Sequence, residues 1–219
     1  MKLVIGGIKG GTGKTTIATN LAYMRSAAGK KVLLVDADEQ KSSSDWSDQR
    51  VGMNIKTDWT TIQLSGMYLY SEINKLVNNY DDIIIDTGGR DNSSQRSALT
   101  IADVFLMPFK PKAFDIWTLG KARQLLCEVG AINPLLRPLA VLNQSDANSQ
   151  ADIDQAKEII SECKELICLP MSIGSRRSFG NAATEGLSVM ELDSEKKAWI
   201  QKAQAEMQML YDLIYPRQH

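Results

Sequence analysis

A run of glycine, lysine and threonine residues near the start of the chain has the composition of a phosphate-binding loop. The run Lys9-Gly10-Gly11-Thr12-Gly13-Lys14-Thr15-Thr16 directly follows the apolar residues Leu3-Val4-Ile5. This order predicts a strand, a loop and then the start of a helix. Glycines let the backbone N–H groups of such a loop turn toward a phosphate, and the helix N-terminus adds partial positive charge. We therefore expect residues 10–16 to bind a nucleotide, with Lys14 reaching its β- and γ-phosphates and the Thr15 hydroxyl binding Mg²⁺.

The loop departs from the strict G-x-x-x-x-G-K-[ST] pattern, because Ile8 stands where the first glycine would be. It carries instead a second lysine, Lys9, ahead of the G-G-x-G-K-T residues. This feature resembles the deviant Walker A loop of the ParA/MinD family of dimeric ATPases. The resemblance implies an ATP-bound homodimer in which Lys9 crosses the interface and contacts the nucleotide of the partner.

Composition indicates a single globular domain. Hydrophobic residues make up 43% and charged residues 23% of the 219-residue chain, which is typical of a folded protein. Apolar runs fall short of the roughly 20 residues that a membrane-spanning helix needs. Since Met1-Lys2 leads straight into the first apolar run, we also expect no signal peptide. The net charge is −1 and the pI is about 5.9, so any contact with nucleic acid must come from a local basic patch.

Cysteine and histidine usage restricts the chemistry further. Cys127, Cys163 and Cys168 lack a tight metal-binding spacing, and we expect them to be reduced core thiols of a cytoplasmic protein. The single histidine, His219, ends the sequence, which argues against chemistry that depends on an internal histidine.

Apolar runs that alternate with helical stretches predict an α/β fold with a doubly wound, mostly parallel sheet and flanking helices. Expected strands are Leu3–Gly7, Lys31–Val35, Ile83–Ile85, Ala102–Met107, Leu139–Leu142 and Ile167–Leu169. Expected helices are Lys14–Ala28, closed by Gly29, then Tyr68–Asn78, Trp117–Val129 and Ser194–Ile214.

Two aspartates follow the second predicted strand. Asp36 and Asp38 leave the carboxyl-terminal edge of that strand, where ligands bind in open α/β sheets. Residues two apart on an extended segment face the same side, so both carboxylates can face the phosphates. We expect Asp36 to support the metal through water and Asp38 to orient the attacking water. The alternative is that these aspartates cap a helix or are solvated. The segment Asp36–Gln40 resembles the family's D-x-D-P-Q switch, and Glu39 in place of proline makes it less rigid.

Another acidic strand end has the layout of a Walker B motif. The apolar residues Ile83-Ile84-Ile85 end at Asp86, which we expect to stabilise the shell of Mg²⁺. Gly88-Gly89 follow and would supply a flexible loop that senses the γ-phosphate, since order–disorder changes in such loops are a known switching mode.

A candidate ligand for the nucleotide base is Asn143, which follows the apolar run that ends at Leu142. ParA/MinD relatives use an asparagine at such a strand end to contact adenine. Asn143-Gln144-Ser145-Asp146 also resembles the N-K-x-D guanine motif of GTPases, with Gln144 in place of the lysine that stacks over the base. The overall resemblance favours ATP, and the alternative is that Asn143 caps a loop.

The resemblance to the ParA/MinD family covers nearly the whole chain. Asp38-Glu39-Gln40 with the nearby serines and Trp46 is similar to short, plasmid-type ParA ATPases that lack an N-terminal DNA-binding extension. Matching later segments are Pro108–Pro111, Asp115–Trp117 and the stretch from Arg176 to Glu191. The resemblance implies one ATPase domain over residues 1–219 that forms an ATP-dependent homodimer and binds DNA non-specifically. A ParB-like adaptor would stimulate its slow hydrolysis, and the protein would be cytoplasmic and nucleoid-associated.

Non-specific DNA binding requires basic side chains that neutralise phosphates. The candidates are Arg176, Arg177, Lys196, Lys197, Lys202 and Arg217. Glu195 and Glu206 lie among them, so the alternative is an ordinary solvated helix face.

Other classes of function stay open. A MinD-like ATPase would bind membrane through an apolar stripe on the predicted C-terminal helix, although such a stripe more often packs on a sheet. The stripe consists of Trp199, Ile200, Ala203, Met207, Leu210, Leu213 and Ile214. A P-loop ligase related to dethiobiotin synthetase has no need of Lys9, and the cysteines do not sit where an iron protein of nitrogenase bridges its cluster. The cargo can be a plasmid, a chromosome or a protein cluster.

Overall fold

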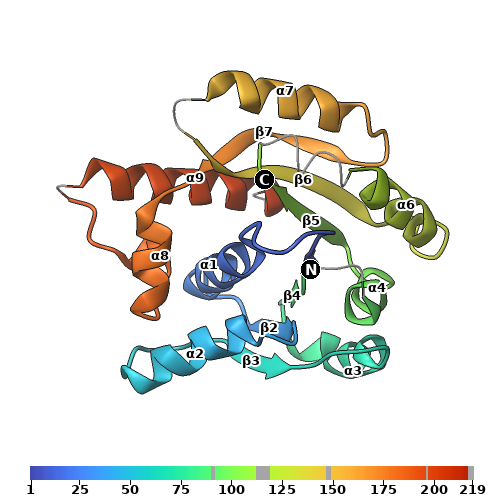
Figure 1. Ribbon diagram of the computed structural model, residues 1–219. Helices are drawn as coiled ribbons and strands as arrows, with labels where there is room; N and C mark the ends of the chain where they lie inside the picture. The colour runs from blue at the N-terminus through green and yellow to red at the C-terminus, as the bar shows by residue number, and fades with distance from the viewer. Residues whose placement is uncertain (90–91, 112–118, 147–148, 196, 217–219) are drawn as a thin grey trace.

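The computed structural model describes residues 1–89, 92–111, 119–146, 149–195 and 197–216, and they form the predicted α/β architecture (Figure 1). Within these residues, seven parallel strands form one sheet in the order β3-β2-β4-β1-β5-β6-β7. The strands are β1 Lys2–Ile5, β2 Val32–Ala37, β3 Thr60–Gln63, β4 Asp82–Thr87, β5 Val104–Phe109, β6 Arg137–Ser145 and β7 Ile167–Gly174.

Helices cover both faces of this sheet. The helices are α1 Lys14–Ala27, α2 Ser42–Gly52, α3 Leu69–Leu76, α4 Ser93–Leu99, α6 Leu119–Gly130, α7 Gln150–Ser161, α8 Arg177–Thr184 and α9 Ala198–Ile214, with 3₁₀ turns η1 Val77–Asn79 and η2 Val189–Glu191. Figure 1 shows α1, α8 and α9 on one side of the sheet and α3, α4 and α6 on the other. Each side has its own apolar core. Because β2, β4 and β5 are buried along their whole length, near-continuous apolar runs encode them.

The predicted position of the first helix, α1, is confirmed. It starts at Lys14 and ends within a residue of the expected end. Gly29 takes a φ of 78°, and the Lys30 N–H donates to the carbonyl of Arg25, as in a left-handed helix cap.

Other elements differ from their predicted bounds. The C-terminal helix begins at Ala198 instead of Ser194, β5 covers Val104–Phe109, and α6 is described only from Leu119 because residues 112–118 lie outside the described part. Strand β6 runs on to Ser145, so Asn143 lies within a strand and not after it. Strand β7 extends to Gly174.

The apolar stripe of the C-terminal helix packs against the protein. Ala203, Met207, Leu210 and Ile214 are buried in the core that α9 shares with α1 and the sheet, and Ile200 is also buried. At the edge of the stripe, the Trp199 side chain is 45% exposed to solvent. The prediction that such a stripe covers a sheet is therefore confirmed. In the described residues, no helix combines the length and the apolarity needed to cross a bilayer.

The cysteines do not all follow expectation. All three are free thiols, and Cys163 is buried, but Cys127 is exposed on α6. The prediction of three core thiols is wrong for Cys127, because its position lies on the solvent side of an amphipathic helix.

Candidate functional site

The predicted phosphate loop connects β1 to α1 at the carboxyl-terminal edge of the sheet. Gly11 and Gly13 have φ values of 72° and 88°, a region that only glycine enters at little cost. A Cβ on Gly13 would also lie 2.2 Å from Nδ2 of Asn143. Glycine at position 13 is therefore required both by the backbone conformation and by the approach of β6.

The Lys14 side chain is held inside this loop. It is only 6% exposed, and its Nζ donates to the carbonyl of Lys9 at 3.3 Å. Burial lowers the pKa of Lys14, while the carboxylates of Asp86 and Asp38 act in the opposite direction. The ammonium group is thus placed near a carboxylate of β4 and one of the segment after β2, and a phosphate could replace its contact with the Lys9 carbonyl.

A cleft of about 830 Å³ opens beside the loop. The phosphate loop forms one wall, the segment from Asp38 to Ser42 forms another, and Gly88, Gly89 and Asn92 form a third. Lys9 does not line this cleft among the described residues, and instead lines a separate small hollow with Met107 and Phe109. The structure therefore brings Lys14, Thr15 and Asp38 together around the cleft, while Lys9 contacts Lys14 through its carbonyl.

Two buried carboxylates lie at the ends of β2 and β4, just before the segments that line the cleft. Asp36 and Asp86 are register partners on β2 and β4, and both are almost inaccessible. Asp36 accepts the N–H of Ser44 at 2.8 Å, and Asp86 accepts the hydroxyl of Ser43 at 2.5 Å. Asp36 therefore helps to anchor the start of α2, as the alternative interpretation of this residue allowed.

The environment of Asp86 is suited to a cation. Burial, reinforced by the neighbouring charge of Asp36, raises the Asp86 pKa from 3.8 to about 7, against the effects of Ser43, Thr15 and Lys14. One of its oxygens, Oδ1, is buried and has no hydrogen-bond partner among the described residues. A buried carboxylate of this kind is stabilised in its charged form by a nearby metal ion. Oxygen donors such as these and the Thr15 hydroxyl are the ligands that Mg²⁺ prefers.

Asp38 occupies the wall of the cleft opposite Lys14. It is partly exposed, and its Oδ1 accepts the N–H of Gln40 at 3.1 Å, which closes a tight turn. Its own N–H donates to Asp36 at 3.2 Å. A Cβ on Gly88 would lie 3.4 Å from Oδ1 of Asp38, so the Asp38 carboxylate and the loop after β4 are neighbours.

The loop after β4 lies directly on the phosphate loop. A Cβ on Gly89 would come within 2.4 Å of the Cα of Gly10, a distance that no side chain tolerates. The two backbones can therefore touch only because residue 89 is glycine, whereas a Cβ on Gly10 would have open space. The following residues, Arg90 and Asp91, lie outside the described part of the chain.

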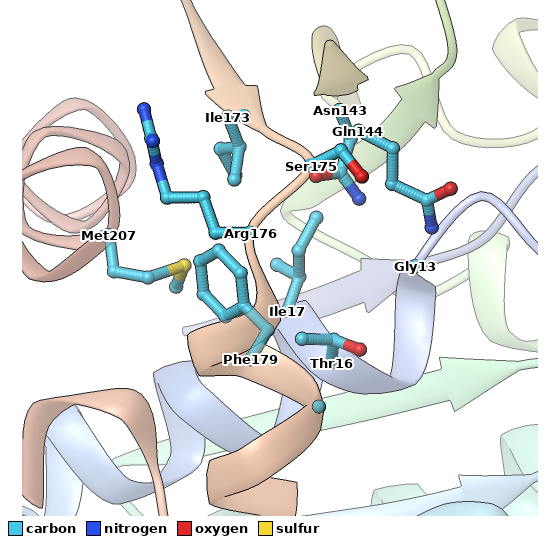
Figure 2. Close-up of a pocket in the computed structure, with 12 residues that line it drawn as sticks. Gly13, Thr16, Ile17, Asn143, Gln144, Ile173, Ser175, Arg176, Phe179 and Met207 are labelled. Carbon is cyan, nitrogen blue, oxygen red and sulfur yellow. The ribbon is translucent and has the colours of Figure 1, made fainter. Parts of the chain in front are cut away.

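A second pocket of about 220 Å³ adjoins the cleft and shares Gly13, Thr16 and Gln144 with it. Figure 2 shows the polar side chains of Asn143 and Gln144 across this pocket from Phe179. Asn143 is buried, and its Nδ2 donates to the carbonyl of Thr12 at 2.6 Å. The side chain of Gln144 reaches the carbonyl of Gly11 at 3.2 Å. A pocket with an aromatic ring, aliphatic walls and amides has the chemistry of a site for a planar base.

Arg176 takes part in the wall of this pocket. Its guanidinium points toward α9 and forms an ion pair with Glu206 at 2.5 Å (Figure 2). Glu206 also accepts the N–H of Gly174 at 3.1 Å. Of the other basic candidates, Arg177, Lys197 and Lys202 are exposed, whereas Lys196 and Arg217 lie outside the described residues.

Several residues of the site could not be identified from the sequence. Ser43 and Ser44 hold the two buried carboxylates, yet in the sequence they form part of a polar run without periodicity. Asn92 lines the cleft and caps α4, where its side chain accepts the N–H of Gln95. The polar run just after Asp36–Gln40 was the one available signal for Ser43 and Ser44.

This fold and this site together define a P-loop nucleotide-binding protein. Residues 3–189 match the CobQ/CobB/MinD/ParA nucleotide binding domain, so the chain belongs to this family, which includes the ParA/MinD ATPases.

Relatives in this family cover almost the whole chain. The maintenance of carboxysome distribution protein A of Halothiobacillus neapolitanus is 28% identical over 206 residues, which are 90% of this chain and 89% of that protein. A putative plasmid partition protein of Borrelia burgdorferi bound to AMPPNP shares the fold with a TM-score of 0.73 and 18% identity, covering 97% of this chain and 98% of the other. The septum site-determining protein MinD of Pyrococcus horikoshii, complexed with Mg-ADP, has a TM-score of 0.71 and 18% identity, with coverages of 99% and 97%.

Proposed function

We propose that this protein is a slow, Mg²⁺-dependent ATPase that works as a nucleotide switch. The observation that carries the proposal is the cleft in which the phosphate loop, Asp38 and the Gly88–Gly89 loop face one another. Phosphoryl transfer needs positioned charge and an oriented water more than it needs covalent chemistry. Lys14 would stabilise the phosphate charge, and Asp38 would position the attacking water. The AMPPNP and Mg-ADP complexes of structural neighbours support this choice of ligand.

Mg²⁺ fits the hydroxyl of Thr15, which lines the cleft, and the buried carboxylates of the neighbouring strand ends. We assign Thr15 as its direct protein ligand, with Asp36 and Asp86 supporting its waters. Mg²⁺ usually keeps several waters and binds through few protein groups together with phosphates. When bound, it would neutralise the charge of the β- and γ-phosphate oxygens. We place the base in the adjoining pocket next to Asn143 and favour adenine over guanine, because Gln144 is tied back to the loop by its contact with Gly11.

The roles of Asp38 and Lys14 can be separated by substitution. Asp38→Ala should bind Mg·ATP but lower turnover by about 10²-fold or more, since it removes the group that orients water. Lys14→Gln should lose nucleotide affinity as well as turnover. Asp48→Ala, which removes an exposed carboxylate from α2, is the matched control. The measurements are phosphate release and binding of a fluorescent ATP analogue, and normal turnover by Asp38→Ala would refute the role of Asp38.

We further propose that two nucleotide-bound copies form a homodimer, with Lys9 reaching the site of the partner. The position of Lys9 outside its own cleft supports this arrangement. In the dimer, Lys9 would add a second positive charge at the γ-phosphate, which is where charge stabilisation contributes most.

The dimer would act in DNA segregation as a cytoplasmic, nucleoid-associated protein that binds DNA non-specifically. A ParB-like adaptor would stimulate hydrolysis and release it. The plasmid partition neighbour supports a plasmid as cargo. The carboxysome distribution relative supports a second candidate, in which the cargo is a protein assembly positioned on the same DNA. A MinD-like membrane role is less well supported, because the apolar stripe of α9 is used by the core.

DNA binding can be tested with random-sequence duplex DNA at low and moderate salt. We expect binding with Mg·ATP, little binding with ADP or without nucleotide, and a steep loss with salt, because phosphate neutralisation releases counterions. Charge reversal at the exposed Arg177 should weaken binding without changing ATP affinity. Lys121→Glu reverses an equally exposed charge on α6, away from α8 and α9, and serves as the control. Binding that is identical in all nucleotide states would contradict the switch.

A further inference from the structure

A fully buried glutamine in α4 joins the two loops of the nucleotide cleft. Gln95 is 0% exposed. Its Oε1 accepts the N–H of Gly7, at the entrance of the phosphate loop, at 2.8 Å. The same oxygen lies 3.1 Å from the hydroxyl of Thr87, the last residue of β4 before the Gly88–Gly89 loop. One amide oxygen therefore fixes the phosphate loop relative to the loop that faces it.

The surrounding sequence makes room for this contact. A Cβ on Gly6 would lie 2.5 Å from Oε1 of Gln95 and 2.6 Å from the hydroxyl oxygen of Thr87, so a side chain at position 6 would displace both. The Nε2 of Gln95 is buried and has no hydrogen-bond partner among the described residues. An unpaired buried amide costs free energy, so keeping a glutamine at this buried position needs an explanation.

Helix α4 extends these contacts to the surface. At its start, Asn92 lines the nucleotide cleft and accepts the N–H of Gln95 at 2.9 Å. Farther along the helix, the buried Ser94 accepts the N–H of Gly66 at 2.8 Å, and Ser97 accepts the N–H of Tyr70 at 3.0 Å. The segment 66–70 is therefore held by two serines of the helix that Gln95 anchors.

The same segment forms part of an open groove. Met67 and Tyr70 line a groove of about 540 Å³ together with Arg96 and Ile132. Met67 is 69% exposed and Tyr70 is 47% exposed. A displacement of α4 would change the shape of this groove, because Arg96 and Ser97 of α4 also line it.

We propose that Gln95 is a positioning residue that couples nucleotide binding to the 66–70 segment. The inference rests on the proposed function, since the nucleotide must occupy the cleft next to Asn92. A γ-phosphate in the cleft would act on both the phosphate loop and the Gly88–Gly89 loop, and Gln95, which is hydrogen-bonded to Gly7 and Thr87, would pass that effect to α4. A ligand shifts such an equilibrium only through contacts that differ between the two states, and the γ-phosphate supplies that difference.

Hydrogen exchange followed by mass spectrometry tests this coupling. The full chain is compared with Mg²⁺ alone, with Mg·ADP and with Mg·AMPPNP. In the wild type, we expect AMPPNP to change the exchange rates of the Gly66 and Tyr70 amides several-fold relative to ADP. Gln95→Leu should still bind AMPPNP, yet its 66–70 segment should exchange at the same rate with either nucleotide. Gln95→Glu keeps an acceptor oxygen and should restore the response.

Two further variants keep the test decisive. Ser97→Ala removes only the contact of Ser97 with the 66–70 segment, so hydrogen exchange at Tyr70 should become fast in every nucleotide state while turnover is retained. Thr87→Val, which removes one of the two donors to Gln95, replaces Gln95→Leu if that variant does not fold, and should weaken the response. A normal nucleotide response in a folded Gln95→Leu protein, or a wild type that binds AMPPNP without any change at 66–70, would overturn the coupling. A wild type that binds no nucleotide at all would instead remove the proposed function.

Discussion

The buried carboxyl of Asp86 leads to a quantitative prediction about pH. Burial raises its pKa in the folded, ligand-free protein from 3.8 to about 7, whereas in the unfolded chain the group titrates near its ordinary value. Between these two values the folded protein holds a proton that the unfolded chain has lost. Its contribution to stability is therefore fully present below pH 3.8 and is lost as the pH rises through about 7. The two pKa values differ enough to make this contribution about 4 kcal/mol, at about 1.4 kcal/mol per pH unit.

Asp86→Asn removes the titrating group and keeps its shape. We expect the free energy of unfolding of the variant, relative to the wild type, to rise by up to about 4 kcal/mol between pH 4 and pH 8. The assay is urea denaturation across this range, without nucleotide and with a chelator. Asp58→Asn, which removes an exposed carboxylate, controls for the loss of one negative charge. The pH dependence is the quantity to compare, because the substitution also alters the contacts with Ser43 and Thr15.

A bound ligand should stabilise the wild type more than it stabilises Asp86→Asn. Bound Mg²⁺ favours the ionised carboxylate, and a ligand that binds only the folded state stabilises it. With Mg·AMPPNP at pH 8, the wild type should become the more stable of the two proteins. A difference in stability that stays flat from pH 4 to pH 8 without ligand would refute the reasoning, since it would mean that burial does not hold a proton on Asp86.

Two further substitutions test the loop and the packing around α2. Gly13→Ala should weaken ATP binding at least about tenfold, because a left-handed residue with a side chain costs about 1–2 kcal/mol and its Cβ would meet Asn143. Binding of a fluorescent ATP analogue measures this effect. The control is Gly120→Ala, where the added Cβ has open space. Arg50→Met should lower the free energy of unfolding by about 3–5 kcal/mol, because it leaves Glu191 without the buried, 2.6 Å partner that it now has; an unchanged urea midpoint would show that the ion pair contributes nothing.

The sequence was most informative where local chemistry and local structure coincide. The loop at residues 9–16 needs glycines, a lysine and a threonine for its function, and those residues also set the strand–loop–helix order. Strands that are buried on both faces are visible as apolar runs. The same applies to α1, whose end at Gly29 is encoded by a glycine with positive φ.

Elements that are stabilised mainly by tertiary contacts could not be predicted from the sequence. Helix α2 begins with three serines and lacks a clear apolar period. It is stabilised by hydrogen bonds from Ser43 and Ser44 to carboxylates on β4 and β2. Strand β3 lies at the sheet edge and consists mostly of threonine and glutamine. The contact of Gln95 with Gly7 joins residues 88 positions apart, so no local pattern predicts it.

The central claim is that ATP switches the protein between two assembly states through Lys9. The most direct measurement is the solution mass of Asp38→Ala, with Lys9 intact or replaced by glutamine, in Mg·ATP, in Mg·ADP and without nucleotide. We predict twice the 24.2 kDa mass of the chain for Asp38→Ala in Mg·ATP only, and the single-chain mass for Asp38→Ala with Lys9→Gln in every condition. A single-chain mass for Asp38→Ala in saturating Mg·ATP, or a dimer that forms equally well without Lys9, would contradict the claim.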